Sequence, residues 1–426
     1  MPPRLIPSET ALVLGGGGAK GAYQIGAARA LEELGIRYAH VYGTSIGALN
    51  AAMLAQGDLQ AAARLWETLR LSDVVTPESI ALAEEAETMF SRPDKVLDFI
   101  TRDAQKKGLD TTPLFSVVRS AVHEEKLRQS DIAFGLTATR FPSLSPVEKK
   151  LDDMVSGSVC DWLEASCACF PALPMKNIDG ERYLDGGFSD NVPVEMAIRA
   201  GAKHIIALDI GRTQAHMQYA LRPNVTYIRT SHPLGGLLTF DPVRSRQNMI
   251  LGYNDTLRAF GQLRGTHYSF DPIDAQLLHR RAQDFVCFLT AYEAEMKKKE
   301  ALLFPLLEEA LRPGSDAVDY FLRALEYCAQ TLSIDPARVY TFDTMRSAIA
   351  DALPIEQARA MLASLLDGRI GVLFAPPQPD KKVVLACLHL ILRQEGRFSS
   401  LAMHTLSAFP RELLCALTLR WVLGEQ

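Results

Sequence analysis

The stretch that decides the fold is VYGTSIGALN, residues 41–50, in which one serine stands between two glycines. The chain before Ser45 is β-branched and aromatic, and the chain after it is rich in alanine and leucine, so the sequence predicts a strand, a tight turn and a helix. The pentapeptide GTSIG fits the pattern G-x-S-x-G, which in this context is typical of a nucleophile elbow. The alternative is that Ser45 only caps the helix, in a pentapeptide that occurs by chance.

The same order of elements occurs just upstream. The run ALVL from Ala11 predicts a buried strand, GGGG follows from Gly15, and the next residues are apolar at helical spacing up to Gly35. Two successive strand-turn-helix units are typical of a parallel sheet covered by helices. Further strands are expected in DIAFGLTATR from residue 131, YLDGG from residue 183, HIIALDIG from residue 204 and NVTYIRT from residue 224.

Length and composition limit the possible functions. The chain has 426 residues, a formal net charge of -5 and 48% hydrophobic residues, which is ordinary for a globular protein and argues against a general nucleic-acid binder. Strand patterns fade beyond about residue 272, so we expect two domains, residues 1–271 and 272–426, the second of them helical. Residues 58–128 are mostly helical and charged, and we expect them to form an insertion that covers a site as a lid.

Cysteine usage and the lengths of the apolar runs predict the compartment. The chain has seven scattered cysteines, an odd number that suits a reducing environment. Cys167 and Cys169 are the only close pair, and their spacing is not that of a structural zinc site, so we expect no metal. We find no apolar run of the ~18 to 20 residues that a membrane-spanning helix needs, and no signal peptide pattern. The expected location is cytoplasmic, and peripheral contact with a membrane surface stays open.

A glycine-rich loop, GGGAKG at residues 16–21, lies between the first predicted strand and helix. It matches G-x-G-x-x-G, so one reading is a dinucleotide-binding loop. Glu32 and Glu33 come too early for the acidic residue that binds the ribose in such sites, about 20 residues further on. The nucleotide hypothesis therefore has no second supporting motif.

A third motif, YLDGGFSDNVPV at residues 183–194, places Asp185 at the end of a predicted strand, before two glycines. A serine hydroxyl is a poor nucleophile at neutral pH and needs a positioned base. None of the nine histidines lies on an obvious catalytic turn, so a carboxylate is the alternative base. The motif is also compatible with an ordinary turn, which is the simpler interpretation when it is considered alone.

Five blocks between residues 10 and 211 resemble the patatin-like phospholipase family. In order they are LGGGGAKGAYQIGAARALEELG, VYGTSIGALNAA, EASCACFPALPM, YLDGGFSDNVPV and GAKHIIALDIG. The resemblance implies an α/β fold, a three-layer sandwich with a mainly parallel central sheet, followed in this chain by the helical C-terminal region. It also implies a dyad of serine and aspartate in place of a triad.

The resemblance assigns roles to residues of the three motifs. Ser45 is the expected nucleophile and Asp185 the expected base. Backbone amides of Gly16, Gly17 and Gly18 are the expected oxyanion hole. The supporting motif positions are Lys20, Gly21, Gly43, Gly47, Gly186 and Gly187. Lys20 stands where the family frequently has arginine, and it is expected to assist a phosphate, to hold the loop, or to be an ordinary surface lysine.

Other carboxylates are candidates for the base. Asp190 is followed by Asn191 and Pro193, and is expected to hold the loop that orients Asp185. Asp209 follows a predicted strand, where a structural role is plausible. An ordinary aspartate, with a pKa near ~3.9, is a weak base, so the mechanism favours a pKa of Asp185 that burial has raised.

The expected function is that of a carboxylic ester hydrolase of the phospholipase A or lysophospholipase type, which acts on phospholipids or other acyl-ester lipids through an acyl-enzyme and needs no cofactor. The segment ETMFSRPDKVLDFITR from Glu87 is either ordinary core or an apolar surface for such a substrate. A second hypothesis is a regulatory protein whose C-terminal helices bind a partner or form an oligomer, with the charged run EAEMKKKEALL from Glu293 as one candidate face.

Overall fold

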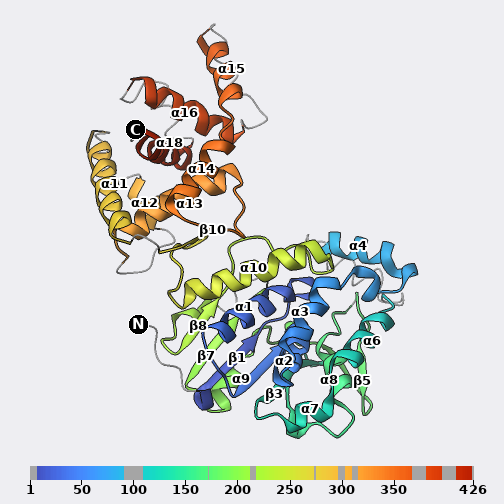
Figure 1. Cartoon of the computed structure of the whole chain (residues 1–426). Helices are drawn as coiled ribbons and strands as arrows, with labels where there is room; N and C mark the ends of the chain where they lie inside the picture. Colours follow the sequence, from blue (N-terminus) through green and yellow to red (C-terminus); the bar gives the residue numbers. More distant parts are fainter. Residues whose placement is uncertain are drawn as a thin grey trace. The chain divides into compact units, whose positions relative to one another are not determined.

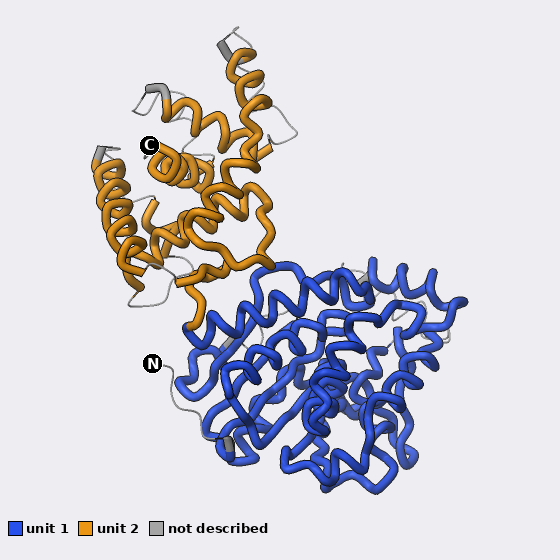
Figure 2. Tube along the Cα trace, viewed as in Figure 1, with its two compact units in different colours: residues 1–261 blue, residues 262–426 orange. Residues whose placement is uncertain are grey.

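The structure is a computed structural model of the chain, and it divides into two compact units, residues 1–261 and 262–426 (Figure 2). It describes residues 7–90, 109–170, 172–211, 217–272, 275–295, 303–308, 315–366, 380–395 and 409–424. The domain boundary expected between residues 271 and 272 falls a short way inside the second unit. Most of the apolar segment expected to begin at Glu87, and most of the charged run that begins at Glu293, lie outside the described residues.

The first unit contains a sheet of eight strands in the order β5-β6-β3-β2-β1-β7-β8, with β4 paired to β3. The strands are β1 (Thr10–Leu14), β2 (His40–Thr44), β3 (Ala133–Phe141), β4 (Ser145–Lys150), β5 (Lys176–Ile178), β6 (Glu181–Asp185), β7 (His204–Leu208) and β8 (Val225–Ile228). The run from β3 through β2, β1 and β7 to β8 is parallel, and β4, β5 and β6 pair antiparallel. The predicted mainly parallel sheet is confirmed, as are all six strands expected from the sequence.

Helices cover both faces of this sheet (Figure 1). They are α1 (Ala22–Glu33), α2 (Ile46–Ala55), α3 (Leu59–Thr68), α4 (Ile80–Phe90), α6 (Thr112–Ala121), α7 (Glu124–Gln129), α8 (Val159–Ser166), α9 (Val194–Arg199) and α10 (Pro242–Ala259). Ala11 and Val13 of β1 pack in one core cluster with Met196 of α9. Leu12 and Leu14 alternate with them and are also fully buried, so β1 has protein on both faces. Both faces are buried, which gives the predicted three layers.

The second unit is helical, as the sequence predicts. Its helices are α11 (Ala275–Glu295), α12 (Leu303–Glu308), α13 (Ala317–Leu332), α14 (Phe342–Ala352), α15 (Ile355–Leu366), α16 (Lys381–Glu395) and α18 (Pro410–Gly424). A short parallel pair of strands, β9 (Ser269–Phe270) and β10 (Val339–Tyr340), is an addition that the sequence pattern did not indicate. The amphipathic helix α13 buries Phe321 and Leu325 in a separate core with α16 and α18, so this unit has its own hydrophobic centre.

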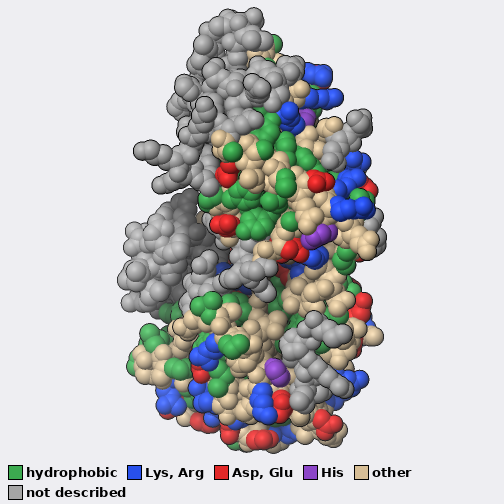
Figure 3. Space-filling view, turned by 90° about the vertical axis from the view of Figure 1, so that its left-hand side faces the viewer, with side chains coloured by type: hydrophobic (Ala, Val, Ile, Leu, Met, Phe, Trp, Pro, Cys, Tyr) green, Lys and Arg blue, Asp and Glu red, His purple; other side chains and the backbone are tan. Residues whose placement is uncertain are grey.

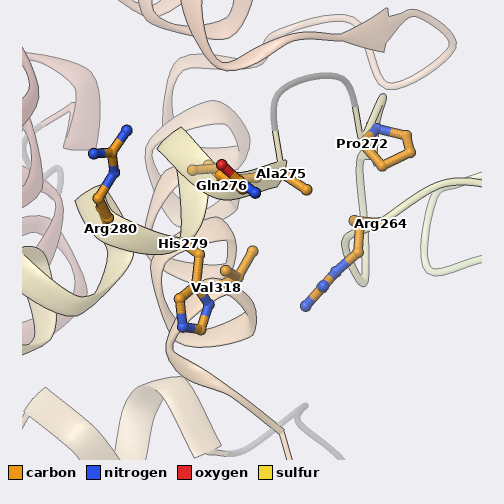
Figure 4. Close-up of a pocket in the computed structure, with 8 residues that line it drawn as sticks. Arg264, Pro272, Ala275, Gln276, His279, Arg280 and Val318 are labelled. Carbon is orange, nitrogen blue, oxygen red and sulfur yellow. The ribbon is translucent and has the colours of Figure 1, made fainter.

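A cavity of about 520 Å³ lies in this second unit, where α11 begins (Figure 4). Arg264 lines it and forms ion pairs with Asp316 and Asp319, at nitrogen–oxygen distances of 3.0 and 2.6 Å. Arg280 also lines it and is exposed. The Arg264 charge is therefore compensated within the protein.

Two features bear on possible partners. On the described part of the face in Figure 3, lysine and arginine side chains lie among aspartates and glutamates, in keeping with the small net charge. Across the ranges that the structure describes, no helix has both the length and the apolar character needed to cross a membrane.

Candidate active site

Ser45 occupies the turn between β2 and α2 in a strained backbone conformation, with φ 56° and ψ -130°. Few non-glycine residues adopt a positive φ, and such strain persists only where the surroundings hold it. Here the Ser45 N–H donates to Oγ of Ser166 at 2.8 Å, and that hydroxyl donates to the Thr137 carbonyl at 2.7 Å. The predicted strand, tight turn and helix are confirmed. The Ser45 side chain makes no capping hydrogen bond to α2, so the helix-cap alternative is wrong.

The glycines on either side of Ser45 allow α2 to pack directly on the sheet. A Cβ atom added at Gly47 would lie 2.3 Å from the Leu14 carbonyl oxygen. A Cβ atom added at Gly43 would lie 2.3 Å from the Gly47 carbonyl oxygen. Neither distance leaves room for a methyl group, so both positions of the G-x-S-x-G pattern are required by close approach of the backbone.

The Ser45 hydroxyl donates a hydrogen bond of 2.6 Å to Oδ2 of Asp185. The other carboxylate oxygen, Oδ1, accepts the Gly187 N–H at 2.7 Å. Asp185 is 6% exposed, and burial raises the pKa of its carboxyl to about 6, although the hydrogen bonds from Ser45 and Gly187 act in the opposite direction. A carboxylate with this pKa accepts a proton more readily than an exposed aspartate does at neutral pH.

Strand β3 brings the two residues together. Its Thr137 pairs with Thr44 at the end of β2, and its next residue, Ala138, pairs with Asp185 at the end of β6. Strand β4 pairs with residues 135–140 of β3 and so occupies one edge of that strand. Strands β2 and β6 therefore both pair with the other edge of β3, one after the other along its length. The carboxyl ends of β2 and β6 therefore meet, and Ser45 and Asp185 leave the sheet side by side.

The two rival carboxylates have other positions. The backbone of Asp190 holds the turn after β6, because its N–H donates to the Gly186 carbonyl at 2.8 Å and its carbonyl accepts the Thr44 hydroxyl at 2.9 Å. The Asp209 carboxylate accepts hydrogen bonds from Arg229 at 2.8 Å and from the Tyr227 hydroxyl at 2.6 Å. Asp190 braces the loop as the sequence suggested, and Asp209 belongs to an ion pair at the end of β7.

The glycine-rich loop passes directly beside Ser45, since a Cβ atom at Gly16 would lie 3.0 Å from the Ser45 Cβ. The Gly16 N–H donates to the Asn191 carbonyl at 3.1 Å, and the Asn191 side-chain amide donates to the Gly16 carbonyl at 3.2 Å. The N–H of Gly16 is thus occupied. Within the described chain, the N–H groups of Gly17 and Gly18 have no hydrogen-bond acceptor. Asn191 is a site residue that the sequence motif contained but that its pattern did not single out.

A buried polar network fixes this loop to the neighbouring helices. Gln24 of α1 donates to the Gly15 carbonyl at 2.7 Å and accepts from Asn50 of α2 at 2.9 Å. Asn50 also donates to the Gly21 carbonyl at 3.0 Å and accepts the indole N–H of Trp66 at 2.9 Å. Gln24 and Asn50 are both fully buried and satisfy each other's hydrogen-bonding groups, so the loop and the Ser45 helix are held together.

Lys20 is buried, so its interpretation as a surface lysine is wrong. Its Nζ donates to the Ile210 carbonyl at 3.3 Å, just after β7. Lys20 therefore ties the loop to the sheet, which is one of its expected roles, and a role toward a phosphate stays a prediction.

Two further motif glycines lie where a side chain would not fit. A Cβ atom at Gly21 would lie 2.5 Å from the Trp66 ring, and one at Gly186 would lie 2.2 Å from the Thr137 carbonyl oxygen.

A small cavity of about 60 Å³ opens at Ser45 and Asp185. Its other lining residues are mainly apolar: Gly18, Ile46, Val74, Leu114, Cys167, Cys169, Leu173, Leu237, Leu238 and Phe240. Two of them, Val74 and Leu114, belong to the segment 58–128 that was expected to cover a site. This volume is well below the range of about 300–1,000 Å³ that is usual for small-molecule sites.

Cys167 and Cys169 are free thiols at the wall of this cavity. Burial, together with the Asp185 carboxylate, raises the pKa of both thiols well above the ordinary value. Both are therefore neutral and behave as small apolar side chains at the site. In the ranges that the structure describes, no three His, Cys, Asp or Glu side chains are grouped so as to hold a metal ion.

Residues 12–198 match the family model described as patatin-like phospholipase. Over 221 residues the chain is 30% identical to patatin-like phospholipase domain-containing protein 6 of Mus musculus, an alignment that covers 49% of this chain and 14% of that protein. Over 329 residues it is 27% identical to lysophospholipase NTE1 of Phaeosphaeria nodorum, covering 74% of this chain and 20% of that protein. This chain thus spans a small part of the length of these relatives.

Among solved structures, VipD from Legionella pneumophila aligns with 98% of this chain and 90% of its own, at 16% identity and a TM-score of 0.35.

Proposed function

We propose that this chain, which carries a patatin-like phospholipase domain over residues 12–198, is a serine hydrolase that cleaves ester bonds of lipids through Ser45 and Asp185. The observation that carries the proposal is the 2.6 Å hydrogen bond from the Ser45 hydroxyl, held on a strained turn, to a buried carboxylate. A nucleophile and a base within hydrogen-bond reach are the minimum requirement for covalent catalysis by serine. The order of the motifs and the family match support the same assignment.

In the proposed reaction, Asp185 takes the Ser45 proton while Oγ attacks the ester carbonyl carbon. The tetrahedral intermediate then collapses, the alcohol leaves with the proton held on Asp185, and the acyl group stays on Ser45. Water attacks this acyl-enzyme with Asp185 as base again, which releases the fatty acid and restores the serine. The Gly187 N–H holds the second carboxylate oxygen throughout, so Oδ2 stays directed at the nucleophile.

We assign the oxyanion hole to the N–H groups of Gly17 and Gly18. Of the three glycines expected from the sequence, Gly16 donates to Asn191 and is better described as a brace for the loop. The Gly18 backbone has φ 57° and also lines the cavity beside Ser45, which favours it as a donor. Loss of one oxyanion donor typically costs about 3 kcal/mol of transition-state stabilisation.

The lining of the cavity favours an apolar acyl group, and the similarity to a patatin-like phospholipase domain-containing protein and to a lysophospholipase supports a lipid ester as the substrate. At about 60 Å³ the cavity must widen before an acyl chain enters. We propose that the described parts of the insertion, residues 58–90 and 109–128, which contribute Val74 and Leu114 to the wall, are the parts that move. Glu87 of α4, in this segment, accepts the N–H of Leu238, a cavity residue, at 2.6 Å, which links the segment to the closed wall.

Contact with a lipid surface, a cytoplasmic location and an oligomer formed through the C-terminal helices stay predictions of the sequence. We propose that such a surface is contacted near Glu87, because Glu87 holds the wall residue Leu238 and the cavity would open there. The dinucleotide hypothesis for residues 16–21 is untested.

The test combines labelling and turnover. Wild type, Ser45→Ala and Asp185→Asn are treated with a fluorophosphonate probe and assayed with a p-nitrophenyl ester and with phosphatidylcholine and lysophosphatidylcholine. We expect Ser45→Ala to lose both label and turnover, and Asp185→Asn to lose turnover by at least a factor of 10². Asp190→Asn is the matched control and retains most activity. Labelling of Ser45→Ala at the wild-type rate, or full activity of Asp185→Asn, would contradict the dyad.

A further inference from the structure

A second cavity in the helical unit combines cationic and apolar side chains. Its volume is about 550 Å³, within the range of 300–1,000 Å³ that is usual for small-molecule sites. Helices α11, α16 and α18 supply its lining, which includes Phe288, His389, Arg393, Arg420, Trp421 and Leu423. This cavity is formed within residues 262–426 and is separate from the one at Ser45.

The polar part of the lining is suited to an anion. Arg393, in the last turn of α16, has no hydrogen-bond or ion-pair partner in the described chain. His389 lies one turn earlier, is 5% exposed, and its Nδ1 is buried without a hydrogen-bond partner. Buried polar atoms are nearly always satisfied, so an unsatisfied one beside a cavity needs an explanation. No acidic side chain is among the described residues that line the cavity.

Arg420 adds a positioned guanidinium to the same cavity. It donates to the Tyr292 hydroxyl and its guanidinium carbon lies 5.5 Å from the centre of the Tyr292 ring. The contact with Tyr292 fixes the position of this guanidinium, which is always charged, so Arg420 adds positive charge to the lining of the cavity. Arg420 and Arg393 come from different helices, so the site exists only in the folded unit.

The rest of the lining is apolar and rigid. Trp421 packs edge-on against Phe285 and Phe321, with ring centres 5.6 and 5.3 Å apart, and Phe288 packs against Phe285 at 6.4 Å. Aromatic side chains packed in this way keep their orientation when a ligand arrives. Leu423 completes an apolar wall that a simple inorganic anion would not use. The ligand that fits both parts has a single anionic end and an aliphatic body.

We propose that this cavity binds a free long-chain fatty acid, with its carboxylate at Arg393, in the positive field to which Arg420 contributes, and its chain against Phe288 and Trp421. This site is independent of the reaction proposed for Ser45. A phosphate ion offers nothing to the aromatic wall, and a neutral ester offers nothing to the arginines. Both therefore serve as discriminating probes.

The test uses the full chain with Ser45→Ala, which prevents turnover. Trp421 is the reporter, since the other two tryptophans, Trp66 and Trp162, belong to the first unit. We expect oleate, below its aggregation concentration, to change tryptophan fluorescence saturably, and methyl oleate and inorganic phosphate to have little effect. The signal is expected to disappear with Trp421→Phe. Absence of an oleate signal, or equal affinity for inorganic phosphate, overturns the proposal.

Variants of the arginines locate the carboxylate. Arg393→Ala is expected to weaken oleate binding about tenfold or more, because a hydrogen bond to a charged group is lost. Arg393 has no partner in the described chain, so this change leaves the fold intact. The matched control is Arg280→Ala, an exposed arginine at the other cavity of the same unit (Figure 4). Unchanged affinity in Arg393→Ala overturns the proposal, as does an equal loss in Arg280→Ala.

A separate measurement keeps the two proposals distinguishable. Hydrolysis by the Arg393→Ala variant with Ser45 intact reports on the reaction, whereas the fluorescence titration reports on the helical unit. Normal oleate binding in an inactive wild type would contradict the hydrolase and support the fatty acid site. An active wild type that does not bind oleate in the helical unit would contradict the fatty acid site and leave the hydrolase proposal intact.

Discussion

Replacing Asp185 by asparagine should stabilise the folded protein at pH 8 while it removes the activity. Burial raises the pKa of Asp185 from 3.8 to about 6, so the folded state binds a proton more tightly than the unfolded chain does. One pKa unit corresponds to about 1.36 kcal/mol, which makes the ionised carboxylate destabilise the fold by about 3 kcal/mol above pH 6. Asparagine has no charge to bury, so it avoids this cost.

The dependence on pH has a defined direction. Below about pH 3 the carboxyl is protonated in both the folded and the unfolded chain, and the wild type has no penalty. Between about pH 3 and 6 the unfolded chain loses its proton first, so the stability of the wild type falls relative to that of the variant. The gain from Asp185→Asn should therefore be less than about 1 kcal/mol at pH 4 and reach about 3 kcal/mol at pH 8.

The assay is urea unfolding followed by tryptophan fluorescence at pH 4, 6 and 8, in a Trp421→Phe background. The remaining tryptophans, Trp66 and Trp162, then report on the first unit alone, which matters because two units need not unfold together. Asp152→Asn, an exposed aspartate, is the control and should change the free energy of unfolding by less than about 0.5 kcal/mol. A gain as large at pH 4 as at pH 8, or no gain at pH 8, would refute the reasoning from burial.

Three further predictions follow from the site. Asp185 must be ionised to act as base, so kcat/KM should fall about tenfold for each pH unit below about pH 6. A kcat/KM that stays constant down to pH 5 would exclude Asp185 from that role. Ser166→Ala removes the partner of the Ser45 N–H and of the Thr137 carbonyl, so it should lower the free energy of unfolding by about 1–3 kcal/mol. It should also lower kcat while changing KM less. Unfolding titrations and steady-state kinetics measure these two effects, and a change in KM alone would contradict the prediction. Gly47→Ala forces a Cβ to within 2.3 Å of the Leu14 carbonyl oxygen and should destabilise the fold by about 1–3 kcal/mol or more, although alanine is the better helix former; equal urea midpoints would show that α2 can move away.

Some features of the structure could not be predicted from local patterns. Strand β4, SPVEKK, is polar and partly exposed, so it lacks the apolar alternation that indicates a strand. Strand β5 has three residues, too few for any pattern. Lys20 was compatible with a surface position, and only the structure shows that it is buried and donates to the Ile210 carbonyl. In each case the structure of the segment depends on the parts of the chain that pack against it, rather than on its own sequence.

Hydrogen bonding of the oxyanion loop was another property that the motif left undetermined. Three glycines in a row predict a backbone that approaches the nucleophile closely, and they do so for a local reason, the absence of side chains. Which N–H groups have an acceptor depends on Asn191, which lies 175 residues further along the chain from Gly16. The motif therefore predicted the loop, whereas only the tertiary structure shows that the Gly16 N–H has an acceptor and that, among the described residues, the N–H groups of Gly17 and Gly18 have none.

The sequence by itself determined the turn at Ser45. The β-branched strand, the two glycines beside the serine and the alanine-rich helix all lie within residues 41–50, so the turn depends on local sequence alone. It also determined the layered α/β plan, through repeated strand-turn-helix units. The tertiary structure alone decided that Asp185, 140 residues from Ser45, accepts a hydrogen bond from the Ser45 hydroxyl, because the register of β3 brings the ends of β2 and β6 together. It also decided the chemistry of that carboxylate, since its pKa depends on burial by distant parts of the chain.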